Sequence, residues 1–146
     1  MGGLDDFARR MSRLSVQVEG NVEQAVKDCA KAVTRTVINA TPVDTGRARS
    51  NWTAELDQAF SRLFPAHVPG EKSSTAEANA EAAINQANEV INQFDITANR
   101  EIHIANSLPY IGALNDGHSK QAPAGFVQEA VMEGLASVRG AKILKD

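Results

Sequence analysis

The chain has 146 residues, of which 42% are hydrophobic and 23% charged, the composition of an ordinary folded domain. A domain of this length buries roughly 68–70% of its unfolded surface, so it needs neither disulfides nor a structural metal. The single cysteine excludes a disulfide within the chain, and the formal net charge is −3. This charge disfavours a free-standing binder of duplex DNA, which usually has a basic face and a high isoelectric point.

The N-terminal third has the apolar spacing of an amphipathic helix, in two sections over 4–14 and 18–40. These sections form either one long helix or two helices joined at a bend. Pro42 disfavours the helical conformation of the residue before it, so the helix should end near Ala40. The first residues lack the basic start of a secretory signal, and no stretch is apolar enough to cross a bilayer. We therefore expect synthesis in the cytoplasm.

A turn and a strand are predicted next. In the turn VDTG, Gly46 is free to adopt a positive φ. Residues 47–57 then alternate between apolar and polar side chains, which is typical of a half-buried strand. Trp52 lies on the apolar face and should anchor the strand in a core that has few other large side chains.

The polar face of this predicted strand is basic at one end and acidic at the other. Arg47 and Arg49 would lie about 6–7 Å apart on a strand, close to the phosphate spacing of DNA. They could equally pair with Glu55 and Asp57 of a neighbouring copy, since head-to-tail association in a closed ring would neutralise both ends. A channel contact and a subunit contact therefore both remain open.

A long loop is predicted over residues 59–74, which contain two prolines and a glycine. Loops of this length in a compact domain tend to be functional or flexible, and we expect this one to be flexible and to become ordered on assembly. Phe60, Leu63, Phe64 and Val68 would place apolar side chains on it. Either a partner covers them or the loop folds back onto the core.

The remaining elements complete an α+β fold, in which a long N-terminal helix and further helices pack on a small antiparallel or mixed sheet. We expect one domain over residues 1–146. The elements that follow the loop are a helix over 75–94, a strand over 96–106, a short helix that Pro109 opens and Gly117 closes, and a last helix from near Pro123.

Motifs of catalysis and metal binding are missing from the sequence. There is no GxSxG, P-loop or HExxH motif. The three histidines, His67, His103 and His118, have no further histidine or cysteine at ligand spacing, so exposed and unliganded histidines are the simpler interpretation. We expect no enzyme activity, no metal and no cofactor.

Two blocks of sequence, TPVDTGRARSNW at 41–52 and IANSLPYIGALNDGHSKQAPAGFVQEA at 104–130, resemble the neck or tail-completion proteins of tailed bacteriophages, the lambda minor tail protein Z-like family. In such proteins the first block ends a helix, and the second leads from a strand into the last helix. The matching residues are Thr41, Pro42, Asp44, Thr45, Gly46, Arg49 and Trp52 in the first block, and Asn106, Pro109, Tyr110, Gly117, His118, Ser119, Gln121, Pro123, Gly125, Phe126 and Val127 in the second.

The resemblance implies a structural virion protein that forms a homo-oligomeric ring, a hexamer or alternatively a dodecamer, at the head–tail junction. Its partners would be head-closure or connector proteins, tail-tube or terminator proteins, and genomic DNA in the lumen without sequence specificity. No membrane is involved. Assembly would take place in the host cytoplasm.

The contact residues are assigned on this basis. We expect Arg47, Arg49, Glu55 and Asp57 to lie at the DNA channel or the subunit interface, and the segment from Tyr110 to Pro123 to form a second contact. Two other functions remain open, a tail-tube terminator ring and, in another class, a small nucleic-acid-binding regulator.

Overall fold

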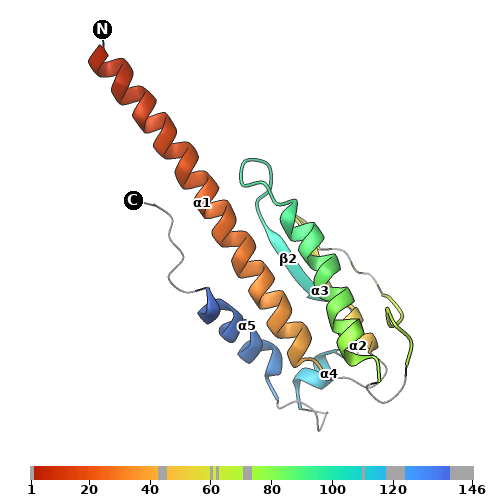
Figure 1. Ribbon diagram of the computed structural model, residues 1–146. Helices are drawn as coiled ribbons and strands as arrows, with labels where there is room; N and C mark the ends of the chain where they lie inside the picture. Colours follow the sequence, from red (N-terminus) through yellow and green to blue (C-terminus); the bar gives the residue numbers. More distant parts are fainter. Residues whose placement is uncertain are drawn as a thin grey trace.

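A computed structural model describes residues 2–42, 46–59, 61, 63–70, 74–109, 111–117 and 124–138. These residues form five helices and a two-stranded antiparallel sheet (Figure 1), so the predicted α+β class with a long N-terminal helix is confirmed. In chain order the elements are α1 Gly2–Ala40, α2 Arg47–Ser50, β1 Trp52–Leu56, α3 Ala76–Asn92, β2 Ile102–Asn106, α4 Ile111–Asn115 and α5 Phe126–Ser137.

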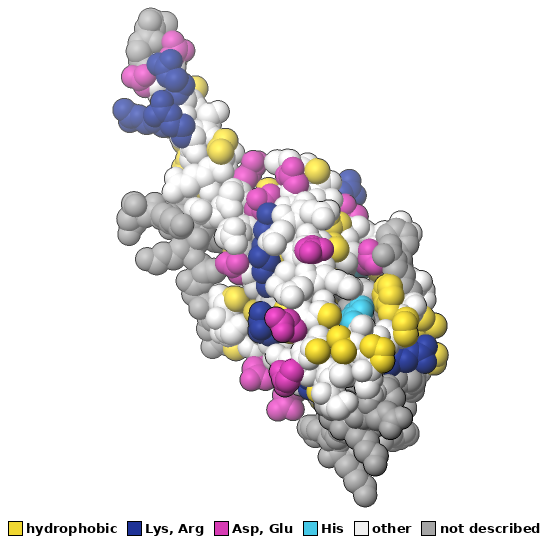
Figure 2. Space-filling view, turned by 45° about the vertical axis from the view of Figure 1, so that its right-hand side comes forward, with side chains coloured by type: hydrophobic (Ala, Val, Ile, Leu, Met, Phe, Trp, Pro, Cys, Tyr) yellow, Lys and Arg dark blue, Asp and Glu magenta, His cyan; other side chains and the backbone are white. Residues whose placement is uncertain are grey.

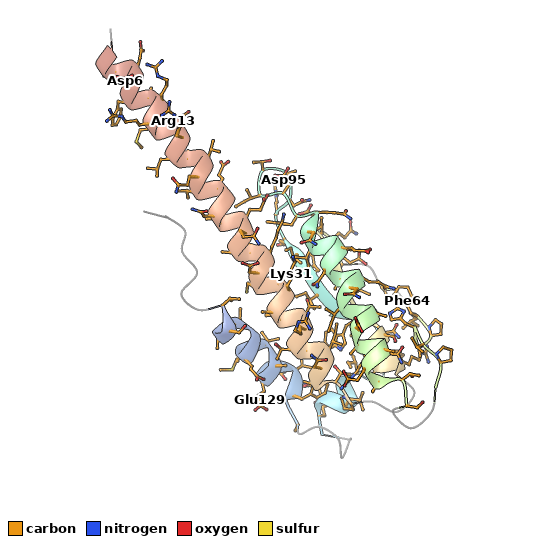
Figure 3. All side chains as sticks on the ribbon, in the orientation of Figure 1. Asp6, Arg13, Lys31, Phe64, Asp95 and Glu129 are labelled. Atoms are coloured by element: carbon orange, nitrogen blue, oxygen red, sulfur yellow. The ribbon has the colours of Figure 1, made fainter. Side chains whose placement is uncertain are left out.

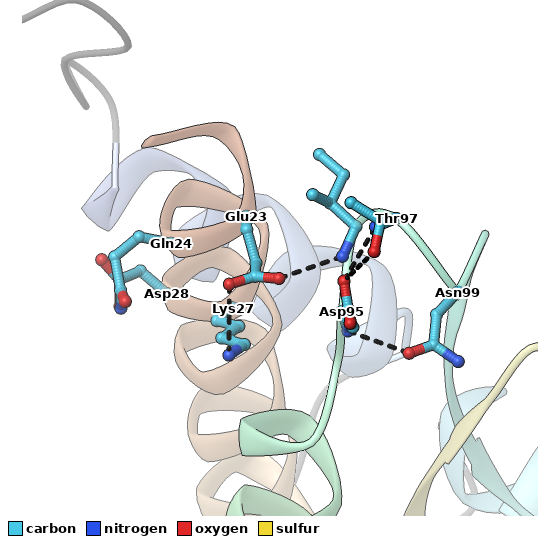
Figure 4. A network of polar contacts seen from close by, with 8 residues as sticks. Glu23, Gln24, Lys27, Asp28, Asp95, Thr97 and Asn99 are labelled. Atoms are coloured by element: carbon cyan, nitrogen blue, oxygen red, sulfur yellow. Dashed lines mark hydrogen bonds and ion pairs between the residues drawn. The ribbon is translucent and has the colours of Figure 1, made fainter. Parts of the chain in front are cut away.

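The two sections predicted in the N-terminal third form one continuous helix of 39 residues. It ends at Ala40, as Pro42 predicts. Residues 3–17 are all exposed, and this end of α1 projects beyond the other elements (Figure 1). The body of the molecule begins near Glu23, whose carboxylate accepts a hydrogen bond from the backbone N–H of Ile96 at 3.0 Å and lies 3.7 Å from the Lys27 ammonium (Figure 4).

The C-terminal half of α1 is the centre of the fold. It packs against α5 on one side and against α3 on the other, and α3 in turn covers the sheet (Figure 1). The core is built mainly from aliphatic side chains, as the low aromatic content predicts, with Trp52, Phe94 and Phe126 as its buried aromatic members. Gly134 lets α5 approach closely, because a Cβ there would lie 2.7 Å from the Cα of Val33.

The first strand is shorter than predicted. It pairs with β2 in the register Trp52↔Asn106 to Leu56↔Ile102. The strand predicted over 47–57 is wrong in its first part, since residues 47–50 form the helical turn α2. Local hydrogen bonds favour this turn: the side-chain amide of Asn51 donates to the Arg47 carbonyl at 2.8 Å.

The second strand also starts later than predicted. Residues 96–98 lie in a turn, and β2 begins at Ile102. The Asp95 carboxylate accepts hydrogen bonds from the backbone N–H of Thr97 at 2.9 Å and from its hydroxyl at 2.6 Å, which stabilises a turn in place of extended backbone (Figure 4).

The remaining helices agree with the sequence. The helix predicted over 75–94 is α3, and the short helix closed by Gly117, with φ +96°, is α4. The last helix begins at Phe126, after Gly125 with φ +77°. None of the helices in the described ranges is long and apolar enough to span a membrane.

Candidate interaction surface

Arg49 closes the C-terminal end of α1. Its guanidinium donates to the carbonyls of Asn39 and Thr41, both at 3.0 Å, and to that of Ala76 at 3.4 Å. The last carbonyls of a helix lack intrahelical donors and carry partial negative charge, so a cation there is stabilising. Burial lowers the pKa of Arg49, and the nearby carboxylate of Glu77 opposes that shift. Arg49 therefore joins α1 to the start of α3.

The predicted pairing of two arginines on one strand face is thus wrong, because both residues lie in α2. The half-buried guanidinium of Arg49 donates to backbone carbonyls at the end of α1, whereas Arg47 is exposed and its Nε donates to the Phe64 carbonyl of the following loop at 3.4 Å. A helical turn places successive side chains about 100° apart, so residues at i and i+2 do not share a face.

Two buried asparagines hold the described part of the 59–74 loop. The Asn51 side chain accepts from the Phe64 N–H and donates to its carbonyl, both at 2.7 Å. The Asn79 side chain does the same for Val68, accepting at 2.7 Å and donating at 3.0 Å. Each amide thus satisfies both backbone groups of one loop residue, as a neighbouring strand would.

The two asparagines belong to one buried polar cluster. Ser50 donates its hydroxyl proton to Asn79 at 3.0 Å and accepts from the His67 N–H at 3.0 Å. Gly46, with φ +83°, passes directly over this cluster, and a Cβ there would lie 2.1 Å from the Asn79 side-chain nitrogen. The glycine of the first block is therefore required both by the backbone conformation and by the space.

The two blocks of sequence meet in the fold. Asn106 pairs with Trp52 in the sheet, and its side-chain amide donates to the Ala48 carbonyl at 2.8 Å. The indole N–H of Trp52 donates to the Thr41 hydroxyl at 2.8 Å, which ties β1 to the end of α1. The described residues of the blocks are thus largely structural, and they position the neighbouring surface.

That surface is the outer side of the loop. Leu63 is 54% exposed and Pro65 is also exposed, while the Phe64 and His67 rings lie 6.1 Å apart. Apolar side chains gather here around a histidine, with a basic side chain at the edge (Figure 2), and Phe64 lies far from the projecting end of α1 (Figure 3). Between the loop and Arg47 lies a hollow of about 560 Å³ that is open to solvent. It is lined by Arg47, Leu63, Phe64, Pro65, Ala66, Pro69 and Gly70.

The loop therefore folds back onto the body through its backbone, while some apolar side chains of its described residues face outward. A partner that covers these side chains stays a prediction. We call the surface formed by Arg47 and residues 63–70 the loop surface. An open, mainly apolar hollow suits contact with a protein partner better than enclosure of a small substrate.

The two acidic residues of the predicted polar face differ in environment. Glu55 is half-buried in β1 opposite His103. Asp57 has φ +66° and lies in the turn at the end of the sheet, where its carboxylate accepts from the side chain of Asn99 at 2.7 Å and from the N–H of Arg100 at 2.5 Å. These hydrogen bonds lower the pKa of Asp57, the one from Asn99 most.

Other site residues of the sequence lie at the α4–α5 end. Pro109 precedes α4, and Phe126 is buried at the start of α5. Asn115 joins the two helices: its carbonyl accepts from the Gly125 N–H at 2.6 Å, and its side chain accepts from the Val127 N–H at 2.9 Å. The residues Asp44, Thr45, Tyr110, His118, Gln121 and Pro123 lie outside the described residues.

No cluster of His, Cys, Asp and Glu side chains that could hold a metal occurs in the ranges that the structure describes. The imidazole Nε2 of His103 lies 2.9 Å from a carboxylate oxygen of Glu101, a contact at the surface of the sheet. The contact between His103 and Glu101 lies on the sheet and adds no chemical function to the loop surface.

The periodic pattern of the sequence does not reveal the roles of Asn51 and Asn79. It assigns Asn51 to a solvated strand face and Asn79 to the polar face of its helix, yet both have 0% exposure. The spacing holds a signal for Asn79, since it lies four residues before Ala83 on the buried face of α3. Asn51 has no such signal: its hydrogen bond to the Arg47 carbonyl is local but depends on a helical turn where alternation predicts a strand, and Phe64 meets it only in the tertiary structure.

Comparison with known proteins identifies a family. The sequence model of the family described as "Bacteriophage HK97-gp10, putative tail-component" matches residues 5–117. The match contains the whole first block and the second block as far as Gly117. No curated protein and no solved structure matches the chain.

Proposed function

The chain belongs to the HK97-gp10-like family of bacteriophage tail components, and we propose that it is a structural, non-enzymatic subunit of a homo-oligomeric ring at the head–tail junction, around the DNA channel. The family match over residues 5–117 carries this proposal. The partners would be further copies of the chain, the head-closure or connector proteins, and the tail tube or its terminator. Residues 1–146 would act as one ring-forming domain.

Exposed apolar surfaces support an assembly role. A ring subunit needs two different faces that complement one another on successive copies. The described part of the chain exposes apolar side chains at the loop surface and at the projecting end of α1 (Figure 2), and also on the outer side of α5. Surfaces of this kind mark contacts with proteins or membranes, and a virion component finds its partners among neighbouring proteins.

The charges of the chain are consistent with a channel that does not bind DNA tightly. Each phosphate that a basic side chain neutralises adds affinity and salt dependence, and a net charge of −3 provides no extended basic face. Of the predicted arginine pair, Arg47 is exposed and Arg49 is half-buried. We therefore place Arg47 and the loop surface at the channel or the subunit joint. The same facts disfavour the small nucleic-acid-binding regulator.

The test uses the phage that encodes this chain, with and without the gene. We expect the protein in purified virions and, by electron microscopy with a labelled chain, as a ring at the junction. Without it, full heads and tails of normal length should accumulate unjoined. Tails of uncontrolled length would identify a tail-tube terminator instead. Absence of the protein from virions, or a position away from the junction, would refute the proposal.

A further inference from the structure

The projecting end of α1 carries an apolar stripe that no other described element covers. Its members recur at alternating steps of three and four residues, the spacing that keeps side chains on one helix face. They are between 41% and 77% exposed. We call them the α1 stripe: Leu4, Phe7, Met11 and Leu14.

The stripe continues a helix face that is covered further along the same helix. Cys29 follows Met11 by 18 residues, which is five helical turns, and so lies on the same face. Cys29 packs beside a core cluster whose members come from α1, β1, α3 and α5. Val33, about one turn further along α1, lies directly against Gly134 of α5. One face of α1 is therefore covered by α5 in its lower part and exposed in its upper part (Figure 1). This continuity points to a helix like α5 as the missing partner.

A second exposed apolar surface lies on the outer side of α5. Met132 is 71% exposed and Leu135 is 48% exposed. Exposed Glu129 and Glu133 lie beside them, and α5 contains no lysine or arginine. We call this surface the α5 face.

The charges of the two surfaces are complementary. Three arginines, Arg9, Arg10 and Arg13, and two aspartates, Asp5 and Asp6, lie among the residues of the α1 stripe, and Asp6 pairs with Arg9 at 2.8 Å. Dark blue and magenta side chains are both seen on the projecting end (Figure 2). Figure 3 shows Arg13 there and Glu129 on α5. Three positive against two negative side chains leave one positive charge in excess beside the α1 stripe, whereas Glu129 and Glu133 give the α5 face two negative charges. The chain after Val138 is also basic, with Arg139, Lys142 and Lys145, so its own tail is a poor match for the stripe.

We propose that the α1 stripe of one copy packs on the α5 face of a neighbouring copy. This inference rests on the ring proposed above, because it names the contact between successive subunits. Such a contact is heterologous: it forms a closed ring when the rotation between successive copies divides a full turn, and an open filament otherwise. The two surfaces of one chain are separated by the distance from about residue 9 to Val33, roughly 36 Å along α1. That distance is close to the diameter of a small domain. Neighbouring subunits of a ring are spaced by about one domain diameter, so the stripe of one copy can reach the α5 face of the next.

Single substitutions on the two surfaces test the contact. Phe7→Asp on the stripe and Met132→Asp on the α5 face each place a charge at an exposed apolar site, so the fold should remain intact. We expect the wild-type chain to self-associate in sedimentation velocity, and each variant to associate at least about tenfold more weakly. Val16→Asp is the matched control: Val16 is 69% exposed on α1 but off the stripe, and its association should equal that of the wild type.

Mixing the two variants separates this contact from its alternatives. The Phe7→Asp chain keeps its α5 face and the Met132→Asp chain keeps its stripe, so an equimolar mixture should form 1:1 dimers that neither variant forms alone. If stripes pair with each other, Met132→Asp will associate like the wild type and the mixture will gain nothing. If the chain's own tail covers the stripe, the wild type will be monomeric, and removal of residues 139–146 will induce association. Either result would overturn the proposal.

A charge exchange gives a second, independent readout. Arg10→Glu and Glu133→Lys should each weaken association, and the doubly substituted chain should recover most of the loss. If the doubly substituted chain associated no more strongly than the single variants, Arg10 and Glu133 would not face each other across the contact, and the proposed pairing of the α1 stripe with the α5 face would be contradicted. Failure of this contact and failure of the proposed function can be told apart by imaging virions that contain the Phe7→Asp chain. A ring that still forms at the junction would refute the contact and leave the proposed function intact.

Discussion

At the scale of single residues, the two sequence blocks act mainly through buried hydrogen bonds. In the first block, Arg49 donates to the Thr41 carbonyl, and Asn51 accepts from the Phe64 N–H. Asn79 of α3 accepts from the Val68 N–H in the same way, and an unpaired buried polar group costs about 1–3 kcal/mol. The blocks thus fix the local backbone and leave the contacts with partners to the exposed side chains around them.

The first prediction concerns Gly46. Gly46→Ala should lower the free energy of unfolding by roughly 2–4 kcal/mol, because alanine is strained at φ +83° and its Cβ would displace the Asn79 amide. Chemical denaturation followed by circular dichroism measures the loss. Gly20→Ala is the control, because nothing lies within 4 Å of a Cβ at that position. This variant should have the free energy of unfolding of the wild type or one up to about 1 kcal/mol higher, since alanine favours a helix more than glycine does. Equal stability of both variants would contradict the assignment.

The second prediction concerns pH and Asp57. Its pKa in the folded state is below the ordinary value, so the ionised carboxylate stabilises the fold above about pH 4, and this contribution is lost as the pH falls through the folded-state pKa. Asp57→Asn, which tolerates the positive φ, should therefore be less stable than the wild type near neutral pH and similar to it in acid. Urea unfolding across this pH range measures the difference. A difference that did not change with pH would refute the prediction.

At the scale of elements, the close packing of α1 and α5 depends on one small residue. Gly134→Ala would place a methyl group 2.7 Å from the Val33 Cα, and backbone atoms cannot move aside as a side chain can. We expect a loss of about 1–3 kcal/mol, with faster hydrogen exchange in α5. Gly112→Ala in α4, where the space is open, should show neither effect. Unchanged exchange in α5 would show that the helices can separate slightly without cost.

At the scale of the whole molecule, the chain is asymmetric. One end is an exposed helix with apolar and basic side chains, and the body carries an acidic helix face and the loop surface. A chain with unlike exposed faces favours head-to-tail assembly over a closed two-fold dimer. The mixing experiment with Phe7→Asp and Met132→Asp tests this asymmetry, because only unlike faces allow two defective chains to complement each other.

The sequence by itself determined the elements that depend on local patterns. Helical spacing predicted a helical N-terminal third, Pro42 predicted its end at Ala40, and the same spacing located α3 and α5. That the two N-terminal sections form one continuous helix was decided only by the structure. The two blocks of sequence also indicated a phage tail protein through their residues alone, and the family match confirms this.

Only the tertiary structure decided the roles of the polar residues between these elements. The alternation over 47–57 predicted a strand, yet residues 47–50 turn as a helix, and Arg49 and Asn51 point inward. The partners that hold them, such as Phe64 and Ala76, lie 13 to 27 residues away. A periodic pattern records which side chains are apolar, whereas a hydrogen bond to a distant backbone group depends on how the whole chain folds.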